Sequence, residues 1–206
     1  MSTHRFKTIL LFGAPGAGKG TQGKILGKIP GFFHLACGDV FRSLDLSSEL
    51  GQQFLAYSSR GELVPDDLTI EMWRQNMQAQ TVLSFYKPAA DLLILDGIPR
   101  SVTQADAMRK HLDVLRVIHL VCRDRDEMVR RMRKRALKEN RLDDADEKVI
   151  RRRFEVYDKE TSPVLACYPP TIIGEVDAMG SPAEVLEHIL EVVVPVQNKH
   201  FRNPLG

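Results

Sequence analysis

Gly13-Ala-Pro-Gly-Ala-Gly-Lys19-Gly-Thr21 is the segment that most strongly indicates the fold. It follows the apolar, strand-length run Thr8–Phe12 and opens a helical pattern over Thr21–Ile29. Glycines allow successive backbone N–H groups to converge on one anion, and the helix N-terminus adds roughly half a positive charge. Lys19 can then reach the outer phosphates of a nucleotide. This order of strand, loop and helix is typical of a Walker-type phosphate loop, and it disfavours a glycine-rich turn without a ligand.

One position departs from the usual loop. The residue after the lysine is normally Ser or Thr, but it is Gly20 here, and Thr21 follows one place later. We therefore expect Thr21 to touch phosphate and Mg²⁺ to be held largely through water, because Mg²⁺ keeps several of its waters in most phosphate sites.

Apolar runs alternate with helical patterns along the rest of the chain, for example the helical stretches Asp66–Gln80 and Asp126–Leu137. Unbroken apolar strands between helices imply a parallel sheet that is covered on both faces. The prediction is an α/β fold like that of P-loop NTPases, with a five-stranded parallel sheet. The other four strands are predicted at Phe33–Ala36, Leu92–Leu95, Val114–Val121 and Thr171–Val176.

Two segments interrupt the alternation, residues 38–65 and 136–144, and mobile covers would occupy such positions. The core is predicted to consist of residues 1–37, 66–135 and 145–206. Ser181 and Glu184 form a capping-box pattern that starts the last helix. The polar segment Gln197–Gly206 is predicted to be a loose tail.

Composition favours a soluble cytosolic protein. Of the 206 residues, 43% are hydrophobic and 27% are charged, and the longest apolar runs are far shorter than a membrane span. Cys37, Cys122 and Cys167 are odd in number and widely spaced, which argues against a disulfide framework or a cysteine-bound zinc ion.

The segment Arg123–Arg153 is basic, with 13 Lys and Arg against 8 Asp and Glu, and ten of the 13 are arginine. Arginine meets phosphate oxygens two at a time. A solvated basic helix and a nucleic-acid patch are the alternatives, but the segment lacks interleaved aromatic residues. Arg131 and Arg135, at i and i+4, project from one helix face.

Arg153 lies on the apolar stripe of its predicted helix, so it should point inward and need an anionic partner. Phosphate is the favoured partner, and a structural pair with Asp143 or Asp144 is the alternative. Arg151 and Arg152 are predicted to lie on a solvated face.

Five motifs resemble the adenylate kinase family of nucleoside monophosphate kinases, in its short-lid form. In chain order they are Gly13–Gln22 (GAPGAGKGTQ), His34–Arg42 (HLACGDVFR), Gly61–Asp66 (GELVPD), Leu95–Arg100 (LDGIPR) with Gln104, and Arg141–Asp144 (RLDD) with Arg153. Together they span most of the chain. The resemblance implies an NMP-binding excursion at 38–65, a short lid at 136–144 and transfer of the terminal phosphate of Mg·ATP to AMP.

The resemblance also implies a set of residue roles. The ATP site would comprise Gly16, Ala17, Gly18, Lys19, Gly20, Thr21, Arg131, Arg135 and Gly180. The AMP site would comprise Cys37, Arg42, Glu62, Leu63, Val64, Gly97, Ile98, Pro99, Arg100, Gln104, Arg141 and Arg153. Catalysis would rest on Lys19, Asp96, Arg100, Arg131, Arg135, Arg141 and Arg153. Asp96 would orient Mg²⁺ through water.

Phosphate as the nucleophile needs no general base, since the second pKa of a phosphate monoester is about 6. Alignment of the two nucleotides and exclusion of water are the requirements. ATP and AMP are the expected partners, with neither nucleic acid nor a membrane, and the chain is expected to be monomeric.

Two other functions stay open at this point. Ala36 and Cys37 replace the family's usual Ser-Thr, as often happens in uridylate/cytidylate kinases, whereas Gln104 favours AMP. A P-loop protein that binds ATP for regulation is the alternative from another class.

Some residues are predicted to be structural. A core or edge role is favoured for His34, and Asp39 is expected to cap a helix at Val40–Arg42. Met72, Met77 and Phe85 are expected in the core.

Overall fold

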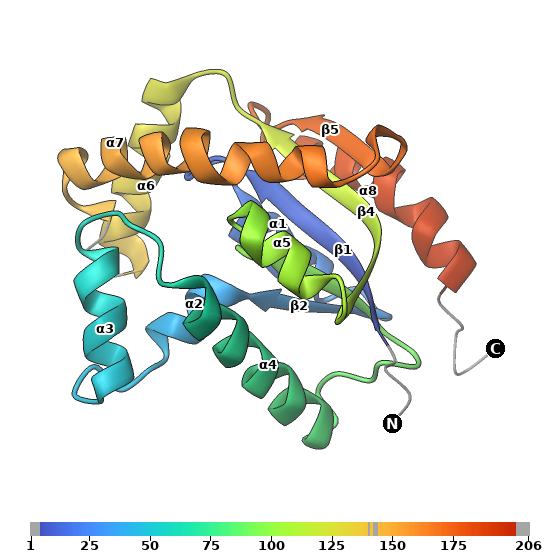
Figure 1. Cartoon of the computed structure of the whole chain (residues 1–206). Helices are drawn as coiled ribbons and strands as arrows, with labels where there is room; N and C mark the ends of the chain where they lie inside the picture. The colour runs from blue at the N-terminus through green and yellow to red at the C-terminus, as the bar shows by residue number, and fades with distance from the viewer. Residues whose placement is uncertain (1–4, 140, 142–143, 201–206) are drawn as a thin grey trace.

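The computed structural model describes residues 5–139, 141 and 144–200. Its centre is a five-stranded sheet in the order β2-β3-β1-β4-β5, in which every neighbouring pair is parallel (Figure 1). The fold class and all five predicted strands are confirmed. The strands are β1 (Phe6–Gly13), β2 (Phe32–Ala36), β3 (Leu92–Asp96), β4 (Leu112–Val121) and β5 (Ile173–Asp177).

Helices connect these strands, as parallel pairing requires. The α-helices are α1 (Lys19–Leu26), α2 (Cys37–Arg42), α3 (Glu49–Ser58), α4 (Asp66–Val82), α5 (Val102–Met108), α6 (Arg125–Glu139), α7 (Glu147–Val156) and α8 (Pro182–His200). A π-helical turn, Tyr157–Thr161, continues α7, and 3₁₀ turns at Ser162–Cys167 and Pro170–Ile172 lead into β5.

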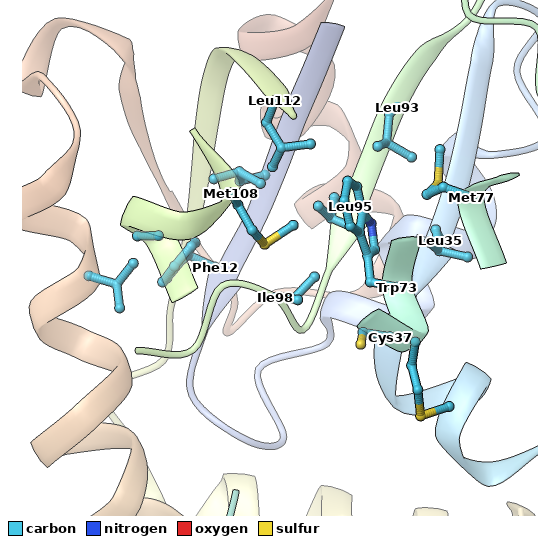
Figure 2. Packing of buried hydrophobic residues seen from close by; sticks show 14 of the residues in the cluster. Phe12, Leu35, Cys37, Trp73, Met77, Leu93, Leu95, Ile98, Met108 and Leu112 are labelled. Carbon is cyan, nitrogen blue, oxygen red and sulfur yellow. The ribbon is translucent and has the colours of Figure 1, made fainter. Parts of the chain in front are cut away.

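The sheet is buried on both faces because alternate residues of each strand enter two different cores. Leu10 of β1 packs with α2, α4 and α5 on one face, whereas Ile9 packs with α1 and α8 on the other. Figure 2 shows the first core, where Trp73 and Met77 of α4 lie near Leu35, Leu93 and Leu95 of the sheet. Trp73 is 1% exposed and belongs to this core.

A third, smaller core holds α6 and α7 together above the phosphate loop. It contains Ala14 of the loop, Met128 and Met132 of α6, and Ile150 and Phe154 of α7. The helices α6 and α7 and the helix α3 lie at the same end of the molecule, to the left in Figure 1. The basic segment is thereby brought to the end of the sheet from which the loop rises.

The structure tests several local predictions. Ser181 and Glu184 form the predicted capping box: the Ser181 N–H donates to Glu184 Oε2 at 2.6 Å, and the Glu184 N–H donates to Ser181 Oγ at 3.3 Å. Met72 and Met77 are buried, but Phe85 is 68% exposed, so its assignment to the core was wrong. It follows Ser84, which has positive φ, in the turn after α4, and this turn directs it outward.

The prediction of a loose tail from residue 197 was also wrong for residues 197–200, which are the last turn of α8. Gln197 Nε2 donates to the carbonyl of Pro30 at 2.8 Å, which fixes this turn to the body of the protein. The remainder of the predicted tail, residues 201–206, lies outside the described residues. Within the described ranges, each helix is too short or too polar to traverse a lipid bilayer.

Candidate active site

A cavity of about 600 Å³ opens at the carboxyl ends of the strands, where ligands gather in open parallel sheets. The loop after β1, the starts of α2 and α5, the excursion after α3, and helices α6 and α7 all contribute to its wall. Of the predicted site residues, those that line it are Gly16, Ala17, Gly18, Lys19, Gly20, Thr21, Cys37, Arg42, Glu62, Leu63, Val64, Asp96, Gly97, Pro99, Arg100, Gln104, Arg131, Arg135, Arg141, Arg153 and Gly180.

Ile98 is the predicted residue that does not line the cavity. Its side chain is 2% exposed and packs in the core beneath α4 and α5, as Figure 2 shows. Its neighbours Gly97 and Pro99 reach the cavity in its place. Ile98 can therefore shape the acceptor side only through its backbone and packing.

The backbone of the phosphate loop adopts conformations that require glycine. Gly13, Gly16 and Gly18 have positive φ values of 148°, 85° and 95°. A Cβ at Gly13 would lie 2.6 Å from the carbonyl oxygen of Leu120, so this glycine is also required by the close approach of β4. Gly18 is the N-cap of α1 and has open space on its Cβ side. Gly18, Lys19 and Gly20 line the cavity, so the N-terminus of α1 lies at its wall, where it can bind an anion.

The side chain of Lys19 folds back onto the phosphate loop. Its Nζ donates to the carbonyl oxygens of Gly13 at 2.7 Å and Ala14 at 3.2 Å. Burial lowers the pKa of Lys19 to about 8; nearby Asp96 opposes this shift, and Arg100 adds to it. The ammonium is therefore held in a partly desolvated position, where a phosphate group would be a strong partner.

Asp96 is the last residue of β3 and is 8% exposed. Its Oδ2 lies 3.8 Å from the position that a Cβ on Gly20 would occupy, so the carboxylate faces the start of α1. Among the described residues, no group of three or more His, Cys, Asp or Glu side chains could hold a metal ion. One carboxylate beside a phosphate loop nevertheless fits Mg²⁺, which binds through one or two carboxylates, phosphate oxygens and water.

The opposite wall carries the predicted acceptor arginines. Asp39 Oδ1 accepts from Arg42 at 2.7 Å and from Arg141 at 3.2 Å, so the carboxylate joins α2 to the segment that follows α6. Burial alone would raise the pKa of Asp39, but the hydrogen bond and charge of Arg42, with the charges of Arg141 and Lys24, together outweigh burial and hold this pKa below its ordinary value. Arg100 is held separately, because its Nε donates to the carbonyl of Gly97 at 2.8 Å.

Gln104 is buried beside these arginines, with 1% of its surface exposed. Its Oε1 accepts from the backbone N–H of Arg100 at 2.7 Å. Its Nε2 donates to Asp66 Oδ1 at 2.7 Å, and Asp66 Oδ2 accepts from the hydroxyl of Ser101 at 2.8 Å. Ser101 caps α5 by accepting from the Gln104 backbone N–H at 3.0 Å. These hydrogen bonds join Gln104, Asp66, Ser101 and the backbone of Arg100 in one network.

Two arginines, Arg135 of α6 and Arg153 of α7, contact a fully buried carboxylate. Asp144 is 0% exposed; it accepts from Arg135 Nε at 2.6 Å and forms an ion pair with Arg153. Arg131 donates to the carbonyl of Ala178 at 2.8 Å and to Glu127 at 3.0 Å. Arg131 and Arg135 both line the cavity, which agrees with their predicted shared face.

Arg153 thus has the structural partner that the sequence left as its alternative, while its side chain also lines the cavity. Asp143, the other candidate partner, and Leu142 of the lid motif lie outside the described residues. Arg151 and Arg152 are exposed and paired with Glu147 and Glu155, as predicted for a solvated face.

Asp39 does not cap α2, since the N-cap is Ala36 and has no side-chain cap. The carboxylate turns instead to the arginines across the cavity. Sequence reasoning also missed Lys134 and Lys138, which line the cavity from α6. They could have been found from their positions on the helix. Lys134 and Lys138 are four residues apart, and each lies three residues after Arg131 or Arg135, so all four share one face.

Comparison with known proteins places the chain among kinases of nucleotides. A family model described as adenylate kinase matches residues 11–172. An adenylate kinase of Kocuria rhizophila is 37% identical over 188 residues, which cover 88% of this chain and 96% of the relative. An adenylate kinase of Thermus thermophilus is 36% identical over 190 residues, covering 89% and 95%. One from a Cyanothece strain is 40% identical over 166 residues, covering 78% and 80%.

Proposed function

Because the chain belongs to the adenylate kinase family, we propose that its cavity binds Mg·ATP at the phosphate loop and AMP at the opposite arginines. The family's reaction is phosphoryl transfer between ATP and AMP, which gives two ADP. One observation carries the assignment of the two sides. Lys19 with its loop, and the arginines Arg42, Arg100 and Arg141, line the same cavity from different elements.

The loop side suits the phosphates of ATP. The backbone N–H groups of Gly16–Thr21 and the N-terminus of α1 would receive the inner phosphates, and Lys19 would leave the loop carbonyls for the outer ones. Arg131 and Arg135 would stabilise charge on the transferred group. Gly180, two residues before α8, would lie beside the adenine of ATP.

The opposite side suits AMP. Arg42 and Arg100 would hold its phosphate, with Arg141 and Arg153 reaching it from the lid side. Residues 62–64, Cys37, Gly97 and Pro99 would shape the pocket, and Gln104 would meet the base. Burial raises the pKa of Cys37 to about 12, so its thiol stays protonated and serves as a small apolar wall.

The chemistry then needs positioning more than proton transfer. The AMP phosphate is already ionised near neutral pH, so its oxygen can attack the terminal phosphate of ATP in line. The cationic side chains offset the repulsion between two anions and stabilise charge that develops in the transition state. We propose that residues 38–65 and 136–144 cover the two nucleotides and exclude water from a core formed by the rest of the chain.

Mg²⁺ would be oriented by Asp96 through water, and it would neutralise charge on the outer phosphates of ATP. Thr21 would touch phosphate from the loop. The role of Asp96 rests on its buried carboxylate, which faces the start of α1, and that of Thr21 rests on its place in the wall of the cavity.

The other functions considered above gain no support. The matching family model and the relatives named above are described as adenylate kinases rather than pyrimidine nucleotide kinases. A nucleic-acid surface on the basic segment is disfavoured because many of its outward arginines are paired with acids. Such pairs are Arg125–Asp158, Arg130–Glu127, Arg133–Glu147, Arg151–Glu147 and Arg152–Glu155. We propose that the protein is a monomer in the cytoplasm. Its three free cysteines suit such a reducing compartment.

Steady-state kinetics of two arginine variants test the two sides. Arg42→Ala should raise KM for AMP by about 10-fold or more, since a charge-assisted hydrogen bond contributes about 1.5–3 kcal/mol, and should leave KM for ATP within about 2-fold. Arg131→Ala should show the reverse pattern. Arg74→Ala, which breaks an exposed pair with Glu71, is the control and should alter neither. Equal effects of Arg42→Ala on both substrates would contradict the assignment.

A further inference from the structure

The buried amide of Gln104 has two partners of opposite character. The backbone N–H of Arg100 can only donate, and it meets Oε1 at 2.7 Å. The carboxylate of Asp66 can only accept, and it meets Nε2 at 2.7 Å. Turning the amide over would place its NH₂ group against the Arg100 N–H and its oxygen against the carboxylate. Both contacts would be repulsive, so the two partners together permit one orientation.

Asp66 is itself held in place. It is the first residue of α4, immediately after the excursion that contributes residues 62–64 to the cavity. Its second oxygen accepts from Ser101 Oγ at 2.8 Å, and Ser101 in turn caps the helix that carries Gln104. The carboxylate is thus fixed at both oxygens, and the link between α4 and α5 passes through it.

One hydrogen on Nε2 and one lone pair on Oε1 make no hydrogen bond with any described residue, and Gln104 lines the cavity. A buried amide gains most from a ligand that satisfies both groups. Adenine presents a donor at its C6 amino group beside an acceptor at N1, which suits a donor–acceptor pair in a fixed order. A base with oxygen at C6 presents the reverse order, an acceptor beside an N1–H donor.

We propose that Asp66 is a positioning residue that fixes the Gln104 amide and so makes the acceptor site select a 6-amino purine over a 6-oxo purine. This inference rests on the proposed function, in which Gln104 meets the base of the accepting nucleotide. Asp66 acts through Gln104 and touches neither nucleotide. Ser101 supports it by holding the carboxylate.

Asp66→Asn tests the proposal, because asparagine keeps the shape but can either donate or accept. Purified enzyme receives Mg·ATP with AMP or with inosine monophosphate, and the diphosphate products are separated by chromatography. We expect the ratio of kcat/KM for AMP to that for inosine monophosphate to fall about 10-fold, since one of two orienting contacts no longer opposes the turned amide. Part of the fall should be a gain with inosine monophosphate.

Asp67→Asn is the matched control. Asp67 is the next residue, is exposed, and also places a negative charge in the first turn of α4. The Asp67→Asn variant should lose the same favourable interaction with the helix N-terminus, but its ratio of kcat/KM for AMP to that for inosine monophosphate should stay unchanged. Circular dichroism and thermal melting verify that each variant is folded. If Asp66→Asn does not fold, Ser101→Ala replaces it, with a smaller fall in the same direction expected.

The outcomes separate this inference from the proposed function. A wild-type enzyme that does not phosphorylate AMP would overturn both. A wild-type enzyme that uses AMP and inosine monophosphate equally would overturn the selection proposed here. A wild-type enzyme that selects AMP, with a ratio that Asp66→Asn leaves unchanged or with equal losses on both acceptors, would overturn the role of Asp66 alone.

Discussion

Replacing Asp144 by asparagine removes a fully buried negative charge that lies between Arg135 and Arg153. Asparagine keeps the volume of the side chain and can still accept one hydrogen bond. The buried negative charge that Arg135 and Arg153 share would, however, be lost. Breaking a buried ion pair by removing one partner typically costs 3–5 kcal/mol of the free energy of unfolding.

The structure places the expected cost at the lower end of that range. The side chains of Arg135 and Arg153 are 28% and 17% exposed, so water can solvate part of the released charge. We expect a loss of about 3 kcal/mol. For a chain of this length, 1 kcal/mol shifts Tm by about 2–4 °C, so Tm should fall by about 6–12 °C.

Differential scanning calorimetry of Asp144→Asn measures this fall, and Asp158→Asn is the control. Asp158 pairs with Arg125 at 2.7 Å, but their side chains are 55% and 45% exposed. Exposed pairs contribute about 0–1 kcal/mol, so the control should lose no more than about 4 °C. Saturating ATP should narrow the difference between wild type and Asp144→Asn, because phosphate would supply the missing negative charge.

Two results would contradict this role of Asp144. A Tm for Asp144→Asn within the range of the control would mean that the buried carboxylate does not stabilise the arginines. A difference that ATP leaves unchanged would mean that these arginines do not meet phosphate.

Three further predictions concern Lys19, the contact between Gly23 and His34, and Cys37. The pKa of Lys19 is lowered to about 8, and bound phosphate should raise it. Above pH 8, ATP binding should therefore be accompanied by uptake of a proton, and the affinity for ATP should fall about 10-fold per pH unit. Calorimetry in buffers of different ionisation enthalpy measures the uptake, which Lys19→Arg should abolish. Gly23→Ala places a Cβ against the imidazole of His34 and should cost about 1–3 kcal/mol in urea unfolding, partly recovered in the double variant with His34→Ala. Cys37, with a pKa near 12, should resist a thiol reagent at pH 8 until the protein unfolds.

Each of these has a clear contrary result. Proton uptake that does not change with pH would contradict the lowered pKa of Lys19. Additive losses in the Gly23→Ala and His34→Ala variants would contradict the direct contact between α1 and β2. Rapid labelling of Cys37 in the native protein would contradict its burial.

The fold could be predicted because its signals are local. The strands β1 and β3 carry unbroken apolar runs, Ile9–Phe12 and Leu92–Leu95, because the sheet is buried on both faces there. The strands β2, β4 and β5 contain polar or glycine residues and are recognised from the apolar residues that remain. The phosphate loop is read from nine consecutive residues. The capping box at Ser181 and Glu184 is equally local, since it depends on two positions three residues apart.

The details of the site depend on contacts between distant residues, and these could not be predicted. The Asp66–Gln104 hydrogen bond spans 38 positions and joins the starts of two helices. Asp39 has the residue type of a helix cap, but a contact with Arg141, 102 positions away, uses its carboxylate instead. Phe85 is apolar and adjoins a helix, but the turn at Ser84 exposes it.

The most direct test of the central claim is the acceptor preference of the purified enzyme. Mg·ATP is supplied with AMP, UMP, CMP or GMP in parallel, and the nucleoside diphosphates are quantified. We expect a strong preference for AMP, two ADP formed for each AMP consumed, and negligible ATP hydrolysis when no acceptor is present. Preference for UMP or CMP, or ATP hydrolysis at the same rate without an acceptor, would contradict it.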